Sequence, residues 1–251
     1  DALPISAFSS LRAVWAQTEE DAVRLRALGA PVLAVTGNLK FDATPNAALL
    51  AQGRAWRARV PRPVVMFASS REGEEAMWVA AMKALKAQGT AAGNSPETPS
   101  SPSPASVQWL IVPRHPQRFV EVAQLFSDAG YSVSRRSQWG EAPETADVWV
   151  GDSLGEMALY FGMAHAALLG GSFAPLGGQN LIEAAACGVP VFMGPHLFNF
   201  AEASTLAAEA GAALRCEDIA HALAEAAATA GDAARLQGMQ EAALGLGAAH
   251  R

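Results

Sequence analysis

Charged side chains are scarce in this sequence, and they are unevenly spread. Only 17% of its 251 residues are charged, and between residues 157 and 201 the only charged side chain is Glu183. A stretch so poor in charge can be a membrane span. However, several glycines and Pro175 interrupt any helix through it, and Gln179 and Asn180 would be costly to bury in lipid. We therefore expect a buried part of a globular domain and no transmembrane helix.

The sequence also lacks the features of several other protein classes. Its two cysteines, Cys187 and Cys216, form neither a disulfide framework nor a metal-binding pattern. A net charge of −6 argues against nucleic acid as a partner held on a basic surface. Disorder is excluded for most of the chain, because 51% of the residues are hydrophobic. The chain begins at Asp1 without a signal peptide, so we expect a piece of a longer protein.

Short apolar runs alternate with helical patterns, which favours an α/β fold. The runs at 14–17, 32–35, 64–68, 109–112, 132–134, 148–150, 166–169 and 189–193 predict strands, and helices are expected at 19–28, 72–86, 117–128, 155–163 and 180–187, with two or three more from about residue 200. Continuous apolar strands between helices indicate a Rossmann-like parallel sheet with helices on both faces. The proline- and serine-rich segment 89–106 is expected to be a flexible surface insert.

Polar residues follow two of the expected strands, at the edge where open α/β sheets bind ligands. Ser69 and Ser70 stand at a helix start, where they could cap the helix or contact a phosphate. Arg114 and His115 precede Pro116 and form a rigid cationic corner. Such a corner suits a phosphate, although an ordinary surface turn with a salt bridge fits the same residues.

Glycines mark two further loops at this edge. Gly155 would let a ligand approach the backbone closely. The loop at 170–179 is rich in glycine and leads into a helix near Asn180, whose free N–H groups should favour an anion. Glu183 lies one helical turn further on and could accept hydrogen bonds from the two hydroxyls of a ribose, or it could be a buried ion-pair partner. Neither a Walker loop nor the dinucleotide glycine pattern is present.

Six motifs in order resemble one enzyme family. They are T-G-N-L-K-F-D at 36–42, A-S-S-R-E-G-E-E at 68–75, V-P-R-H-P at 112–116, G-D-S-L-G-E-M at 151–157, G-G-S-F-A-P-L-G-G-Q-N-L-I-E at 170–183 and G-P-H-L-F-N-F at 194–200. This set, within about residues 14–213, resembles the 3-deoxy-D-manno-octulosonic acid (Kdo) transferases of lipopolysaccharide synthesis. The resemblance implies the GT-B glycosyltransferase architecture, of which this sequence matches the carboxyl-terminal, donor-binding half. Residues 1–35 would end the amino-terminal acceptor domain, and residues 36–251 would form the CMP-sugar-binding domain.

The resemblance also implies an activity. Such enzymes transfer Kdo from CMP-Kdo to a lipid A precursor, with inversion at the anomeric carbon, at the cytoplasmic face of the bacterial inner membrane. The acceptor, the membrane surface and the catalytic base would belong to the amino-terminal domain, so no base can be named on this chain. No metal or other cofactor is expected. A UDP-sugar transferase or epimerase of the same architecture, and a nucleotide-binding module without catalytic activity, stay open as alternatives.

The resemblance assigns roles to individual residues. Arg114, His115 and Pro116 would border the phosphate and the cytidine, and the backbone near Met157 would read the base. Lys40 is a candidate partner of the donor carboxylate or phosphate. The full implied donor-binding set is Lys40, Ser69, Ser70, Arg114, His115, Pro116, Gly155, Glu156, Met157, Ser172, Gly177, Gly178, Gln179, Asn180 and Glu183. Within it, Ser172 and Asn180 would hold the phosphate and Glu183 the ribose. Gln179 replaces a histidine and Ser70 a threonine of many relatives.

Overall fold

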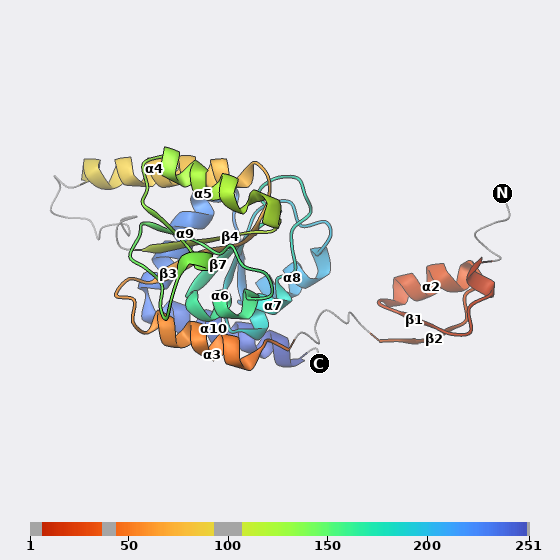
Figure 1. Cartoon of the computed structure of the whole chain (residues 1–251). Coiled ribbons are helices and arrows are strands. Elements are labelled where there is room, and N and C mark those ends of the chain that lie inside the picture. The colour runs from red at the N-terminus through yellow and green to blue at the C-terminus, as the bar shows by residue number, and fades with distance from the viewer. Residues whose placement is uncertain (1–6, 37–43, 93–106, 250–251) are drawn as a thin grey trace. The chain divides into compact units, whose positions relative to one another are not determined.

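The computed structural model describes residues 7–36, 44–92 and 107–249. The chain divides into two compact units, Asp1–Ala43 and Thr44–Arg251 (Figure 1). The division falls somewhat later than the boundary expected near residue 35. Lys40 lies outside the described residues, as does the segment 93–106. No helix in the described ranges is long and apolar enough to cross a membrane.

The first unit contains two parallel strands and one helix. Strand β1 (Val14–Ala16) pairs with β2 (Val32–Val35), and α2 (Glu19–Ala27) connects them. The Thr18 side chain caps α2 by accepting a hydrogen bond from the Asp21 amide at 3.1 Å. Gly29 follows the helix with a φ of 83°, the left-handed conformation common at helix ends.

The second unit is built on a seven-stranded parallel sheet with the strand order β5-β6-β4-β3-β7-β8-β9. Its strands are β3 (Val64–Ser70), β4 (Gln108–Pro113), β5 (Val133–Arg135), β6 (Val148–Val150), β7 (Ala166–Leu169), β8 (Val191–Met193) and β9 (Ala213–Arg215). The central strands are buried along almost their whole length, because helices cover both faces of the sheet. The predicted fold class is therefore confirmed.

Helices lie on both sides of this sheet (Figure 1). They are α3 (Ala47–Arg57), α4 (Glu74–Ala92), α5 (Phe119–Asp128), α6 (Met157–Met163), α7 (Ile182–Ala186), α8 (Ala201–Glu209), α9 (Ile219–Gly231) and α10 (Ala233–Ala249). One face carries α4, α5 and α9 over a buried hydrophobic cluster, where the rings of Phe67 and Trp78 stack with their centroids 4.7 Å apart. On the other face α3 packs against α6, and α10 packs against α7.

The structure differs from the sequence-based expectation in several elements, and α4, α5, α6 and β8 each begin two residues later than expected. The pattern analysis missed α3 and β9, and α4 continues to Ala92, so residues 89–92 are helical and were wrongly included in the flexible insert. Helix α7 begins at Ile182, two residues later than expected. Helix α3 was hard to see because it contains Gly53, a weak helix former. Gly53 lies where α3 meets α6, since an added Cβ would approach the Leu159 carbonyl oxygen to 2.1 Å.

Candidate functional site

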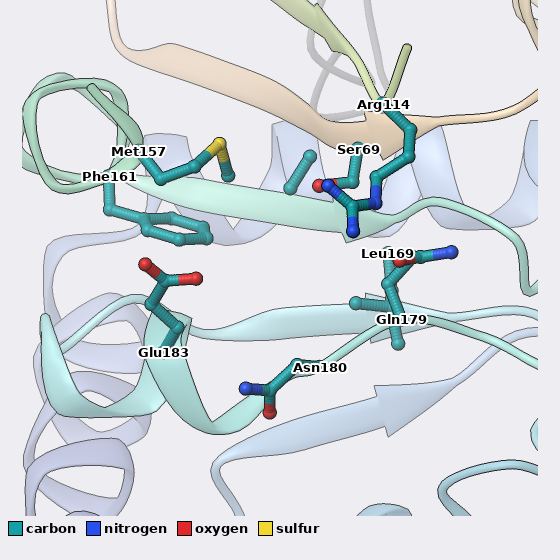
Figure 2. A pocket seen from close by; sticks show the side chains of 9 residues that line it. Ser69, Arg114, Met157, Phe161, Leu169, Gln179, Asn180 and Glu183 are labelled. Carbon is teal, nitrogen blue, oxygen red and sulfur yellow. The ribbon is translucent and has the colours of Figure 1, made fainter. Parts of the chain in front are cut away.

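A cavity of about 260 Å³ lies at the carboxyl ends of β3 and β7 (Figure 2). This is the edge at which open α/β sheets bind ligands. The side chains around it come from both strands, from the loop after β4, from α6, and from α7 and the loop before it. They are Ala68, Ser69, Arg114, Met157, Phe161, Leu169, Gln179, Asn180 and Glu183. Six of the residues chosen from the sequence are therefore brought together from four distant parts of the chain.

One side of the cavity is cationic, and the opposite side is apolar except for the carboxylate of Glu183. In Figure 2, the Arg114 guanidinium lies beside Ser69 at one side, whereas Glu183 lies next to Phe161 at the other, with Met157 close by. Arg114 follows β4, and its amide donates to the Ser70 carbonyl oxygen at 3.0 Å, which extends the β3–β4 pairing to the cavity edge. A ligand with an anion at one end and hydroxyls further along would match this distribution.

Glu183 is the unusual group in the cavity. Burial raises the pKa of its carboxyl group, and the positive charge of Arg114 offsets part of that rise. Within the part of the chain that the structure describes, the Glu183 side chain has neither a hydrogen bond nor a salt bridge. The alternative interpretation as a buried ion-pair member therefore has no support in the described residues. A half-buried carboxylate without a partner is costly, and it is suited to accept hydrogen bonds from a ligand.

Ser69 has a strained backbone at the edge of the cavity. Its φ is 57°, and it is the only described residue other than glycine with a positive φ. The pairing of β3 with β4 shifts register at this point. Next to it, Gly170 approaches so closely that an added Cβ would lie 2.0 Å from the Ser69 carbonyl oxygen. Strain of this kind concentrates at functional sites, where the surrounding structure holds it in place.

Two substitutions separate the strain at Ser69 from its hydroxyl group. Both Ser69→Gly and Ser69→Ala remove the hydroxyl, but only glycine adopts a positive φ without a steric penalty. We expect Ser69→Gly to be more stable than Ser69→Ala by about 1 kcal/mol, and both to bind nucleotide roughly tenfold more weakly than the parent chain. Thermal unfolding and calorimetric titration measure the two effects. Equal stability of the two variants would show that the Ser69 conformation carries no strain.

The amides of the loop after β7 already bind an anion, which is a carboxylate of the protein itself. The Glu74 carboxylate accepts hydrogen bonds from the amides of Gly171, Phe173 and Ala174 at 2.8, 3.0 and 3.2 Å, and from that of Arg71 at 2.9 Å. These amides are therefore not available to a ligand. The sequence analysis missed Glu74, although a carboxylate in the first turn of α4 could have been considered as a partner for a neighbouring loop.

Three residues of the implied donor-binding set, Ser172, Gly177 and Gly178, belong to the loop after β7 and do not line the cavity. The Ser172 hydroxyl is fully buried, donates to the Leu169 carbonyl oxygen at 2.5 Å and accepts from the Gly194 amide at 2.8 Å. Its implied contact with phosphate is thus replaced by a structural role. Gly177 and Gly178 have positive φ values of 87° and 80°, and both are buried.

Other residues of the implied set lie around the cavity but do not line it. Ser70 is buried and donates to Glu75 at 2.9 Å. Glu156 accepts from Arg136 at 2.8 Å and from Ser153, so its carboxylate is already paired. The remaining members outside the lining are His115, Pro116 and Gly155, whose exposure is intermediate for His115 and high for the other two.

The cavity also has lining residues that the sequence analysis did not name. Phe161 is the largest, and it lies one helical turn after Met157 on α6. This spacing places both side chains on one face of the helix. The signal was therefore present in the sequence, but an apolar residue in a buried helix gives no reason to choose it. Ala68 and Leu169, at the ends of β3 and β7, also line the cavity.

Comparisons with known proteins show which proteins this chain resembles. A family model described as 3-deoxy-D-manno-octulosonic-acid transferase (kdotransferase) matches residues 2–43. The chain is 47% identical over 245 residues to the 3-deoxy-D-manno-octulosonic acid transferase of Bordetella pertussis, covering 97% of this chain and 54% of that protein. It is 32% identical to the enzyme of the same name from Haemophilus influenzae, over 86% of this chain and 48% of that protein.

Solved structures show the same fold. The C-terminal CMP-Kdo binding domain of WaaA from Acinetobacter baumannii matches with a TM-score of 0.66 at 23% identity, over 80% of this chain and 98% of that one. Anabaena Alr3699/HepE in complex with UDP-glucose matches with a TM-score of 0.53 at 16% identity, over 95% of this chain and 58% of that one. This chain spans about half the length of the curated relatives it matches. In sequence, this chain is similar over nearly its whole length to 3-deoxy-D-manno-octulosonic acid transferases, and its fold matches that of the C-terminal CMP-Kdo binding domain of WaaA.

Proposed function

We propose that this chain supplies the donor site of a Kdo glycosyltransferase, which transfers Kdo from CMP-Kdo to a lipid A precursor. The observation that carries the proposal is the cavity itself, with Arg114 at one side and the unpaired Glu183 at the other. The domain of WaaA that shares this fold is named for binding CMP-Kdo. The acceptor, the catalytic base and contact with the cytoplasmic face of the inner membrane are assigned to polypeptide beyond this chain.

The charge distribution in the cavity suggests how CMP lies. The phosphate is placed near Arg114 and Ser69, where a guanidinium and a hydroxyl can both donate to it. The ribose is placed at Glu183, which can accept from both of its hydroxyls. The base then lies against the apolar wall that Met157 and Phe161 form.

In the proposed reaction, the acceptor hydroxyl attacks the anomeric carbon of Kdo as the bond from that carbon to the CMP phosphate oxygen breaks. Negative charge grows on the phosphate during this step, and the fixed charge of Arg114 stabilises it more than it stabilises the ground state. A base removes the proton of the acceptor hydroxyl. Because CMP-Kdo carries a single phosphate, we propose that protein groups hold it without a metal ion or other cofactor.

The first test is binding without turnover. We expect this chain to bind CMP more tightly than UMP or UDP in calorimetric titrations, and to transfer no Kdo from CMP-Kdo to a lipid A precursor on its own. A preference for UDP would favour a UDP-sugar enzyme instead. Measurable transfer by this chain alone would contradict the assignment of the base to another part of the protein, and absence of any nucleotide binding would overturn the proposed site.

A further inference from the structure

We propose that Glu74 is a positioning residue for the donor phosphate, acting through the loop at residues 170–180, which we call the β7 loop. The proposal rests on the proposed function, because it concerns how that site is held in shape. Glu74 does not line the cavity, and its side chain is fully buried. It therefore does not touch a ligand in the cavity, and we infer that it acts through the backbone that it holds.

The Glu74 carboxylate connects the loops that follow two neighbouring strands. One oxygen, Oε2, accepts from the amides of Arg71 and Gly171, so it joins the turn after β3 to the β7 loop. The other, Oε1, accepts from the amides of Phe173 and Ala174. Four N–H groups thus converge on one buried anion, an arrangement that in many proteins holds a bound phosphate. In this loop the anion is a side chain of the protein.

The hydrogen bonds continue from Glu74 to the cavity wall. Gly171, whose amide is held by Glu74, accepts at its carbonyl oxygen from the Gly178 amide at 2.7 Å. Gly178 directly precedes Gln179 and Asn180, which line the cavity. The other end of the β7 loop follows Leu169, which also lines it. Fixing the middle of the loop therefore fixes the cavity residues on both sides of it.

The chemistry of this position requires a carboxylate. Only a carboxylate presents acceptors to N–H groups at both of its ends, whereas the amide of a glutamine would turn an NH₂ group toward two of these N–H donors. Within the described residues, Glu74 has no cationic side-chain partner, so the backbone amides alone compensate its charge. Glu74→Gln keeps the size of the side chain and removes half of its accepting capacity.

The neighbouring residue provides a matched control. Glu75 is equally buried and also lies in the first turn of α4, but it accepts from Arg118 at 2.8 and 2.9 Å and from Ser70 at 2.9 Å. Neither Arg118 nor Ser70 lines the cavity, and Glu75 has no hydrogen bond to the β7 loop. Glu75→Gln should therefore destabilise the fold without displacing the loop.

The experiment compares CMP and cytidine binding in the parent chain, Glu74→Gln and Glu75→Gln. We expect Glu74→Gln to weaken CMP binding at least tenfold and cytidine binding less than twofold, because Gln179, at the end of the β7 loop, lies on the same side of the cavity as Arg114 (Figure 2). Glu75→Gln should leave both affinities within twofold of the parent chain. Unchanged CMP binding by folded Glu74→Gln, or equal loss of CMP and cytidine binding, would overturn the proposal.

Amide hydrogen exchange gives a second measurement that needs no ligand. The amides of Gly171, Phe173 and Ala174 should exchange as slowly as those of β3 and β7 in the parent chain, and much faster in Glu74→Gln but not in Glu75→Gln. If the parent chain binds no CMP, the proposed function fails, but the exchange pattern still tests whether Glu74 fixes the β7 loop. Rapid exchange of these amides in the parent chain would show that Glu74 does not fix the loop, even if Glu74→Gln does not fold.

Discussion

Glu183→Gln should weaken CMP binding by roughly 10- to 100-fold, the expected cost of losing hydrogen bonds to a charged acceptor, and should raise thermal stability at pH 7. The two effects have one cause. Burial makes the ionised Glu183 unfavourable in the folded chain, and within the described residues no side chain pairs with it. Glutamine removes that cost, but it can no longer accept hydrogen bonds from ribose hydroxyls at both of its terminal atoms.

The stability gain should depend on pH in a defined direction. The pKa of Glu183 is raised in the folded chain, so the folded state holds this proton more tightly than the unfolded state. The resulting stabilisation is complete below the ordinary carboxyl pKa and is lost as the pH rises through the raised value. The parent chain and Glu183→Gln should therefore have similar melting temperatures at low pH, and the variant should be the more stable one at neutral pH.

The control for this prediction is Glu225→Gln. Glu225 is a partly buried carboxylate on α9 that pairs with Arg235 at 2.6 Å and does not line the cavity. Its substitution should lower stability slightly and leave CMP binding unchanged, the opposite pattern. Melting curves between acid and neutral pH, with calorimetric titration of CMP, measure both effects. A Glu183→Gln variant that binds CMP like the parent chain would contradict the placement of the ribose.

Gly170→Ala should destabilise the second unit by about 3 kcal/mol, the upper end of the usual cost of overpacking. An added Cβ would lie 2.0 Å from the Ser69 carbonyl oxygen and 2.7 Å from that of Ala68. Both are backbone atoms of the central strand β3, so no side chain can move aside to make room. For a domain of this size, the melting temperature should fall by about 6–12 °C.

The same substitution, Gly170→Ala, should also change the shape of the cavity. Any relief of the overlap shifts Ser69 or the start of the β7 loop, and we expect CMP affinity to fall together with stability. Gly140→Ala is the matched control, because an added Cβ there has no atom within 4 Å. It should change stability by less than about 0.5 kcal/mol. A melting temperature of Gly170→Ala equal to that of Gly140→Ala would show that the strands can separate at little cost.

The fold could be predicted because its signals are local. The apolar runs that become β3, β4, β6 and β7 are continuous, and they alternate with helical segments, which is enough to indicate a covered parallel sheet. Helix α3 was not predicted because Gly53 weakens its helical pattern. The reason for a glycine at this position is the backbone of α6, which leaves no room for a Cβ atom. The short edge strand β9, with three residues, likewise gave too little pattern to recognise.

The sequence by itself determined where a ligand should be sought and which chemistry to expect. It placed Ser69 and Arg114 just after strands and Glu183 in the helix that follows a third strand, and parallel strands bring such positions to one edge. Only the tertiary structure decided which polar groups remain free there. The β7 loop amides bind Glu74 and the Ser172 hydroxyl binds backbone, whereas no described residue pairs with the Glu183 carboxylate. Pairing between residues roughly a hundred positions apart depends on how strands and loops meet in space, and no local pattern encodes it.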